Sequence, residues 1–103
     1  MITGCSSGIG RATAIHLAER WSVYATARRP ESIADLERKG CRILPLDVTD
    51  HASAQAAVKV VEDEHGAVGC LVNNAGYGLH GAVETVPIDA ARDEFETNFF
   101  GLA

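Results

Sequence analysis

Residue types that build disulfide frameworks and metal centres are scarce in this chain of 103 residues. It has three cysteines, an odd number without metal-ligand spacing, so we expect free thiols in a reducing cytosol. The four histidines are scattered, and no two of them have the spacing of metal ligands on one helix, so we expect no metal site. Cys5 lies in a glycine-rich loop, where a helix N-terminus could lower its thiol pKa, but we expect no catalytic thiol there because no histidine is nearby in sequence to serve as its base.

Long apolar runs and an excess of basic residues are also missing. No apolar run approaches the ~20 residues of a membrane span, and the first residues show neither the basic nor the apolar segment of a signal peptide. The formal net charge of -5 argues against nucleic acid or an anionic membrane as a partner. We therefore expect a cytoplasmic protein that binds neither nucleic acid nor membrane.

What the chain does contain is an alternation of β-rich and helical segments. Hydrophobic residues make up 47% of it and charged residues 22%, which is typical of a folded chain, and its length allows at most one small domain. Such alternation predicts an α/β fold with a parallel sheet and helices on its faces. Right-handed crossovers then give the strand order 3-2-1-4, half of a doubly wound parallel sheet. The expected strands are residues 1–3, 22–27, 41–46 and 68–73.

The expected helices have recognisable end signals and apolar stripes. They run from the glycine-rich loop to about Arg20, from Pro30 to Lys39 before Gly40, from a cap at Thr49 or Asp50 to Gly66, and onward from about Pro87. Their buried stripes are Ala14, Leu17, Ala18 and Trp21 on the first helix, Ala54, Ala57, Val58 and Val61 on the third, and Ile88, Ala91, Phe95, Phe99 and Leu102 on the last.

Three glycines, Gly4, Gly8 and Gly10, stand between the first expected strand and the first expected helix. A dinucleotide pyrophosphate needs backbone N–H groups at a helix N-terminus with no side chain in the way, and glycines there allow the tight turn and the close approach. Two serines add hydroxyl donors nearby. A plain tight turn is the alternative interpretation. The candidate cofactor-binding residues of this segment are Gly4, Ser6, Ser7, Gly8, Ile9 and Gly10.

This loop, written Thr3-Gly4-Cys5-Ser6-Ser7-Gly8-Ile9-Gly10, and the later Asn73-Asn74-Ala75-Gly76 together resemble two signatures of the classical short-chain dehydrogenase/reductase family. The resemblance covers the whole chain. It implies a Rossmann-type fold and an NAD(P)-dependent enzyme that interconverts a small-molecule alcohol and a carbonyl by hydride transfer. Residues 23–33 resemble members that act on hydroxysteroids and retinol, which hints at an apolar substrate. Classical members of the family are commonly dimers or tetramers, so the resemblance also implies a homodimer or homotetramer.

The choice between the two nicotinamide cofactors should be readable where the second expected strand ends. NAD enzymes place an acid there to bind the ribose 2′-OH. This chain has Ala27 followed by Arg28 and Arg29, and an arginine pairs with the 2′-phosphate that a carboxylate would repel. We therefore predict a preference for NADP(H), with Arg28 as the main contact and Arg29 as the second, and NAD(H) left open. Two solvated arginines on a loop are the alternative.

The resemblance implies further cofactor contacts after the third and fourth expected strands. Asp47 would accept from the adenine amino group, the backbone of Val48 would bind the ring edge, and Asn74, Ala75 and Gly76 would line the ribose and pyrophosphate. Asp47 could instead cap a turn. For Asn73, a role in holding strands together and a contact with the cofactor stay open.

The tyrosine and lysine that the family uses for proton transfer have no counterpart in these residues. The expected spacing is Tyr-x-x-x-Lys, but Tyr24 is followed four residues on by Arg28 and Tyr77 by Gly81. Asn98 is the one candidate catalytic residue, by resemblance to a family asparagine that holds a water, and the alternative is a polar residue on an apolar helix. We interpret residues 1–103 as the N-terminal part of a single NAD(P)-binding domain, incomplete because the catalytic C-terminal part is absent. A non-catalytic dinucleotide-binding truncated module and an unstable fragment are the alternatives.

Overall fold

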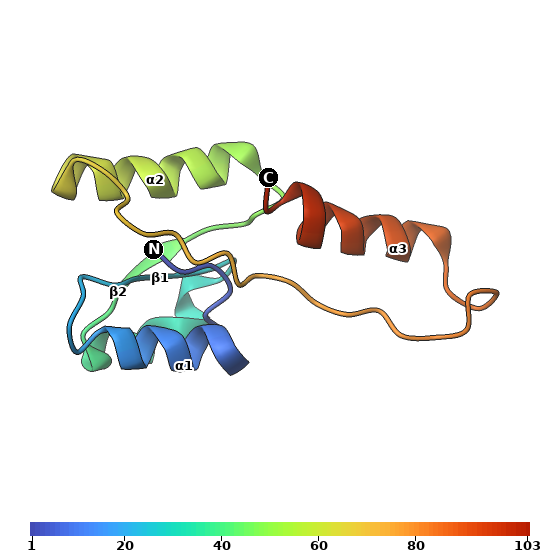
Figure 1. Cartoon of the computed structure of the whole chain (residues 1–103), viewed down its shortest axis with the longest axis horizontal. Coiled ribbons are helices and arrows are strands. Elements are labelled where there is room, and N and C mark those ends of the chain that lie inside the picture. Colours follow the sequence, from blue (N-terminus) through green and yellow to red (C-terminus); the bar gives the residue numbers. More distant parts are fainter.

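The computed structural model describes all of residues 1–103. Helices and strands alternate through its first two thirds, as the sequence predicts (Figure 1). The second helix is a 3₁₀ helix, and the last helical turn is a π-helix. In chain order the elements are α1 (Gly8–Leu17), β1 (Tyr24–Ala27), η1 (Pro30–Lys39), β2 (Arg42–Pro45), α2 (His51–His65), α3 (Ile88–Phe95) and η2 (Glu96–Phe100).

The regular sheet has two parallel strands, in which Tyr24 of β1 lies opposite Arg42 of β2. Ile2 continues it through single parallel bridges, one to Ala25 and one to Val72. Each of the expected strands at residues 1–3 and 68–73 is therefore reduced to one bridging residue. These residues are Ile2, which bridges Ala25 on one side and Val72 on the other, and Val72. All pairings found are parallel, and a regular four-stranded sheet of order 3-2-1-4 stays a prediction.

The β1 strand is buried on both faces and forms the centre of the molecule. Helix α1 lies on one side of the sheet and α2 on the other (Figure 1). Because successive side chains on a strand point to opposite faces, Ala25 packs into the core while Tyr24 reaches His65 of α2, its hydroxyl 3.0 Å from the His65 Nε2. The largest core cluster consists of Ile2, Cys5, Ala14, Val23, Ala25, Ala27, Ile33, Leu36 and Cys41.

The predicted helix ends are confirmed at three positions. The side chain of Asp50 accepts hydrogen bonds from the backbone nitrogens of Ala52 at 3.0 Å and Ser53 at 3.4 Å, and so caps α2. Gly40 ends η1 with a φ of 90°, and Gly66 ends α2 with a φ of 84°. Only glycine adopts this left-handed conformation without strain, so the sequence specifies both stops.

The expected stripe on the first helix is wrong at its last position. Helix α1 ends at Leu17, and the backbone nitrogens of Arg20 and Trp21 both donate to its carbonyl oxygen, which closes a tight turn. Trp21 lies beyond this turn, where helical spacing no longer applies, and it is 62% exposed. Ala14 is fully buried, as predicted.

The chain after Val61 lies on the outside of the molecule. No residue after Val61 is buried, and the segment from the end of α2 leads through a long loop to α3, which projects away from the sheet (Figure 1). The apolar face expected on the last helix is present but uncovered. Its exposed members are Ile88, Phe95, Phe99 and Leu102, so they are not part of the core.

Candidate functional site

A cavity of about 1130 Å³ opens where β1 and β2 end and α1 begins. In parallel α/β folds this edge, outside the carboxyl ends of the strands, is where ligands bind. Twelve of the predicted site residues line it, whereas Gly10 and Asn98 do not. The twelve are Gly4, Ser6, Ser7, Gly8, Ile9, Arg28, Arg29, Asp47, Val48, Asn74, Ala75 and Gly76.

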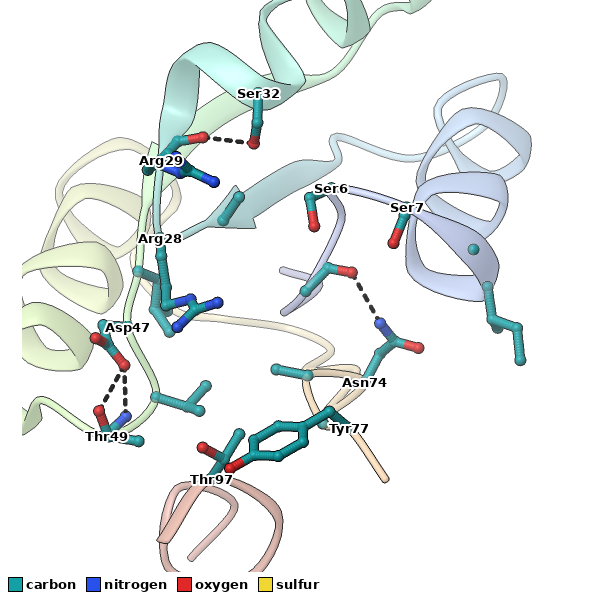
Figure 2. Close-up of a pocket in the computed structure, with 18 of the residues that line it drawn as sticks. Ser6, Ser7, Arg28, Arg29, Ser32, Asp47, Thr49, Asn74, Tyr77 and Thr97 are labelled. Carbon is teal, nitrogen blue, oxygen red and sulfur yellow. Dashed lines mark hydrogen bonds between the residues drawn. The ribbon is translucent and has the colours of Figure 1, made fainter. Parts of the chain in front are cut away.

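The glycine-rich loop presents the N-terminus of α1 to this cavity. Gly4 and Gly8 have φ angles of 70° and 57°, so both positions favour glycine. Ser7 is the N-cap of α1, but its side chain forms no capping hydrogen bond. The hydroxyl groups of Ser6 and Ser7 point into the open space (Figure 2). Free N–H groups and hydroxyl donors together suit an anionic group such as a phosphate.

Gly10 lies behind the loop and allows it to pack closely. A Cβ atom at Gly10 would stand 2.3 Å from the side-chain nitrogen of Asn74 and 2.4 Å from the carbonyl oxygen of Gly4. No real Cβ atom approaches other atoms this closely. The glycine is therefore required by packing against Asn74 rather than by direct exposure to the cavity.

Asn74 joins the two sequence motifs. Its side-chain nitrogen donates to the carbonyl oxygens of Thr3 and Gly4, each at 3.0 Å. The hydroxyl oxygen of Thr3 accepts in turn from the backbone nitrogens of Asn74 and Ala75, also at 3.0 Å. Asn73, for which a holding role was one interpretation, is exposed, so the connection between the motifs is made by its neighbour.

The two arginines after β1 face the cavity from the side opposite the serines. Both guanidinium groups of Arg28 and Arg29 point into it (Figure 2), and neither takes part in any of the four ion pairs of the structure. The hydroxyl of Ser32, in the first turn of η1, donates to the carbonyl oxygen of Arg29 at 2.6 Å. No carboxylate follows β1 directly, and although Arg28 is near enough to Asp47 to contribute to the lowered pKa of that carboxyl, neither arginine is held in an ion pair, so both can meet an anionic ligand.

Asp47 caps a turn, as its alternative interpretation holds. One of its carboxylate oxygens accepts from the backbone nitrogen of Thr49 at 2.9 Å and from the Thr49 hydroxyl at 2.7 Å. The hydroxyl and backbone hydrogen bonds from Thr49 hold the pKa of Asp47 below its usual range, and Arg28 adds to this effect. The turn orients the carboxylate at the rim of the cavity and leaves its second oxygen for another donor.

Asn98 lies in the π-helix η2 and binds the backbone beside the cavity. Its side-chain oxygen accepts from the backbone nitrogen of Tyr77 at 3.0 Å, and its side-chain nitrogen donates to the Tyr77 carbonyl oxygen at 2.6 Å. A Cβ atom at Gly76 would lie 2.9 Å from the Asn98 oxygen. The asparagine thus fixes the loop that follows Asn74, and its catalytic role stays a prediction.

Cys5 is a free, buried thiol, and the lowering of its pKa that its place in the loop could have caused is not found. Its side chain is fully buried and turns away from the cavity, with the sulfur 3.4 Å from the carbonyl oxygen of Ile2. Burial raises the pKa of this thiol, so the helix N-terminus does not activate it.

No three metal-binding side chains gather anywhere in the structure. None of its helices has the length and apolar character needed to cross a membrane.

The sequence interpretation overlooked several residues at this site. Thr3 connects the motifs through its hydroxyl group, but in the sequence it falls within an expected strand, and nothing there indicates this role. Ser32 and Thr49 do follow readable signals, since a serine in a first helical turn binds local backbone, and an aspartate accepts from the backbone nitrogen and hydroxyl of a threonine two residues later. The remaining lining residues that were not predicted are Ala27, Leu46, Tyr77, Asp93, Glu96 and Thr97.

Three comparisons relate the chain to known proteins. The model of the short chain dehydrogenase family matches residues 1–103. The chain is 47% identical over 107 residues to the oxidoreductase calM of Penicillium decumbens, which covers 97% of this chain and 35% of that protein. It is 40% identical over 104 residues to 3-ketodihydrosphingosine reductase of Bacteroides thetaiotaomicron, covering 99% and 37%. The solved structure of a short-chain dehydrogenase from Streptomyces avermitilis matches with a TM-score of 0.88 and 39% identity, over 97% of this chain and 38% of that one.

The chain has a parallel α/β architecture with a cavity at the carboxyl ends of its strands. These features, with the structural match, place its fold among the Rossmann-type folds of oxidoreductases. The chain belongs to the short-chain dehydrogenase/reductase family, whose members bind NAD(P)(H). It spans 35% and 37% of the length of the two relatives named above.

Proposed function

We propose that this chain is the N-terminal cofactor-binding part of an NADP(H)-dependent oxidoreductase that interconverts an alcohol and a carbonyl. The observation that carries the proposal is the pair Arg28 and Arg29, which face the cavity without a carboxylate partner. A 2′-phosphate carries charge close to -2 at neutral pH and is well matched by two guanidinium groups. NAD(H) lacks this phosphate and would leave both arginines unused.

The remaining lining residues fit the rest of a dinucleotide. The N-terminus of α1, with Ser6 and Ser7, would hold the pyrophosphate, and the absence of Cβ atoms at Gly4 and Gly8 leaves its approach open. The free oxygen of Asp47 would accept from the adenine amino group, and the backbone of Val48 would lie at the ring edge. Asn74, Ala75 and Gly76 would line the ribose next to the nicotinamide.

The bound cofactor would supply the hydride, and this chain would orient it. Asn98 holds residues 76 and 77 through two hydrogen bonds to the Tyr77 backbone, and so shapes the end of the cavity where the nicotinamide would lie. We propose that the proton-transfer residues lie outside residues 1–103, since the chain spans about a third of its relatives. We also propose that the completed sheet has the strand order 3-2-1-4. The bridge between Ile2 and Val72 would then belong to the pairing of the first expected strand with the fourth.

An apolar ketone or alcohol is the proposed substrate class. One relative, at 40% identity, is named a 3-ketodihydrosphingosine reductase, and its name specifies a ketone on a lipid-like chain.

The uncovered apolar side chains of α3 and η2 support assembly into a homodimer or homotetramer, since such faces are usually buried against a partner. We also propose a cytoplasmic location, which the three free cysteines support, because a reducing compartment keeps thiols unpaired.

The substitution Arg28→Ala in the full-length protein tests this function. Losing a charge-assisted contact to phosphate should raise the Kd for NADPH about 10- to 100-fold, and the Kd for NADH should change less than about threefold. Arg20→Ala is the matched control, because Arg20 is also exposed and lies at the opposite end of the sheet. An unchanged ratio of the two affinities in Arg28→Ala, measured by titration of cofactor fluorescence, would show that the cofactor assignment is wrong.

A further inference from the structure

An ion pair joins α1 and η1, two elements that each contribute residues to the lining of the cavity. The Arg11 guanidinium, one residue after the glycine motif on α1, pairs with the carboxylate of Asp35 on η1. The other three ion pairs lie on α2 and β2, within α2, and within α3. Neither Arg11 nor Asp35 lines the cavity, but their pair is the only one of the four that joins two different elements that both do, through Gly8 and Ile9 of α1 and Ser32 of η1.

The position of Asp35 puts a negative charge near the proposed phosphate site. In a 3₁₀ helix, residues i and i+3 lie on the same side, so Asp35 stands one turn beyond Ser32 on one side of η1. Ser32 lines the cavity and hydrogen-bonds to the backbone of Arg29. A carboxylate one turn away from Ser32 would repel a phosphate held by Arg29 unless its charge were compensated.

Arg11 supplies that compensation. Its hydrogen bond holds the pKa of Asp35 below the usual range, so the carboxylate is ionised at neutral pH and fully paired with a positive charge. Arg38 lies in the same helix and adds a smaller effect of the same sign. The side chains are 30% and 53% exposed, so the pair is partly screened by solvent and acts mainly through its local charge balance.

We propose that Arg11 is a specificity-determining residue for NADP(H), because it neutralises Asp35 beside the site of the 2′-phosphate. This inference rests on the proposed cofactor function. Arg11 would act through Asp35, so it is a positioning and charge-balancing residue and not a catalytic one. Its removal would leave an unpaired carboxylate that disfavours the phosphate and leaves NADH largely unaffected.

The test is a set of three variants in the full-length protein, measured with both cofactors. In Arg11→Gln, the KM for NADPH should rise about three- to tenfold, the KM for NADH should stay within about twofold, and kcat should not change. The added substitution Asp35→Asn in the Arg11→Gln background should restore the KM for NADPH. Lys59→Gln is the control, because it breaks an ion pair of the same charge type on α2, away from the cavity.

The rescue separates a charge effect from a structural one. If the pair only holds α1 and η1 together, the double variant lacks the pair as well and stays as impaired as Arg11→Gln, which would overturn the inference. Equal losses for NADPH and NADH would overturn it too. The NADPH effect of Arg11→Gln should also shrink at high salt, where the Debye length falls to about 3 Å. A wild-type protein that binds neither cofactor, or shows no preference for NADPH, would instead refute the proposed function.

Discussion

The side-chain nitrogen of Asn74 lies 3.0 Å from the carbonyl oxygen of Gly4, although the two residues are 70 positions apart. The same nitrogen also bonds to the carbonyl oxygen of Thr3, so one amide group holds the turn that presents α1 to the cavity. The glycine motif and the asparagine motif are therefore parts of one structure. A change in either motif should disturb the binding properties of both.

Replacing Asn74 with alanine tests this connection. The change leaves two partly buried carbonyl oxygens without a donor, so the free energy of unfolding should fall by about 1–3 kcal/mol. The Kd for NADPH and NADH should rise together, because the turn and not the 2′-phosphate contact is affected. Urea unfolding and cofactor titration would measure the two effects. Asn73→Ala is the matched control. If it lowered the free energy of unfolding and weakened cofactor binding as much as Asn74→Ala, the assignment of the connection between the motifs to Asn74 would be wrong.

Adding one methyl group at Gly10 should be more damaging than most substitutions on the surface. In Gly10→Ala the new Cβ would overlap both the Asn74 side chain and the Gly4 carbonyl oxygen, at 2.3 and 2.4 Å. We expect a loss of about 3 kcal/mol or more in the free energy of unfolding, with weak binding of either cofactor. Gly69→Ala is the control, since nothing lies within 4 Å of its Cβ position, and it should change stability by less than about 0.5 kcal/mol. Similar unfolding curves for the two variants would contradict the packing argument.

The turn at Asp47 predicts a specific dependence on pH. Its folded pKa is lowered by the Thr49 hydrogen bonds, so the carboxylate stabilises the fold above the unfolded pKa of about 3.9. That contribution is lost as the pH falls through the lower, folded pKa. Thr49→Val removes one donor and should cost about 1 kcal/mol at pH 7, with a smaller difference from wild type below about pH 3.

Urea unfolding of wild type and Thr49→Val between pH 7 and pH 2.5 would measure this difference. Thr13→Val provides the control, because Thr13 lies half-buried on α1, away from Asp47, and its hydroxyl takes part in none of the side-chain hydrogen bonds described above. Any change in its stability should therefore be the same at both ends of the pH range. A difference between Thr49→Val and wild type that stayed constant down to pH 2.5 would mean that Asp47 does not carry the effect.

The three cysteines should differ sharply in reactivity. Burial raises the pKa of both Cys5 and Cys41, whereas Cys70 is exposed. A thiol reagent at about pH 7.5 should therefore modify one cysteine quickly in the folded protein, and Cys70→Ser should abolish this fast reaction. Mass spectrometry of the labelled protein would identify the site. Fast labelling of Cys5 in the folded protein would show that its side chain is not held in the core.

The sequence predicted best those features that depend on neighbouring residues. The Asp50 cap and the stops at Gly40 and Gly66 rest on local chemistry, and all three are found where they were expected. The parallel pairing of β1 with β2 follows from the alternation of strands with helical segments. Twelve of the predicted site residues also share one cavity, because the ends of parallel strands meet at one edge of a sheet.

The features that the sequence did not reveal depend on distant contacts. Residues 68–73 have the composition of a strand, but only Val72 forms a β-bridge, with Ile2, and Cys70 adds one hydrogen bond from the Met1 amino group to its carbonyl oxygen. Trp21 continues an apolar spacing that the turn after Leu17 interrupts. Whether Asn73 or Asn74 holds the motifs together depends on which side chain faces Thr3, and two adjacent asparagines look alike in a sequence.

The bond between Thr3 and Ala75 also sets the order in which the molecule can fold. It closes a loop of more than seventy residues, whose entropic cost, about 3 kcal/mol above that of a loop of about four residues, must be met before the contact contributes anything. The local elements α1, η1 and α2 can form earlier, because their contacts are close in sequence. The cavity should therefore be among the last parts to form, and a nascent chain could not bind a dinucleotide until the segment after Val72 had left the ribosome.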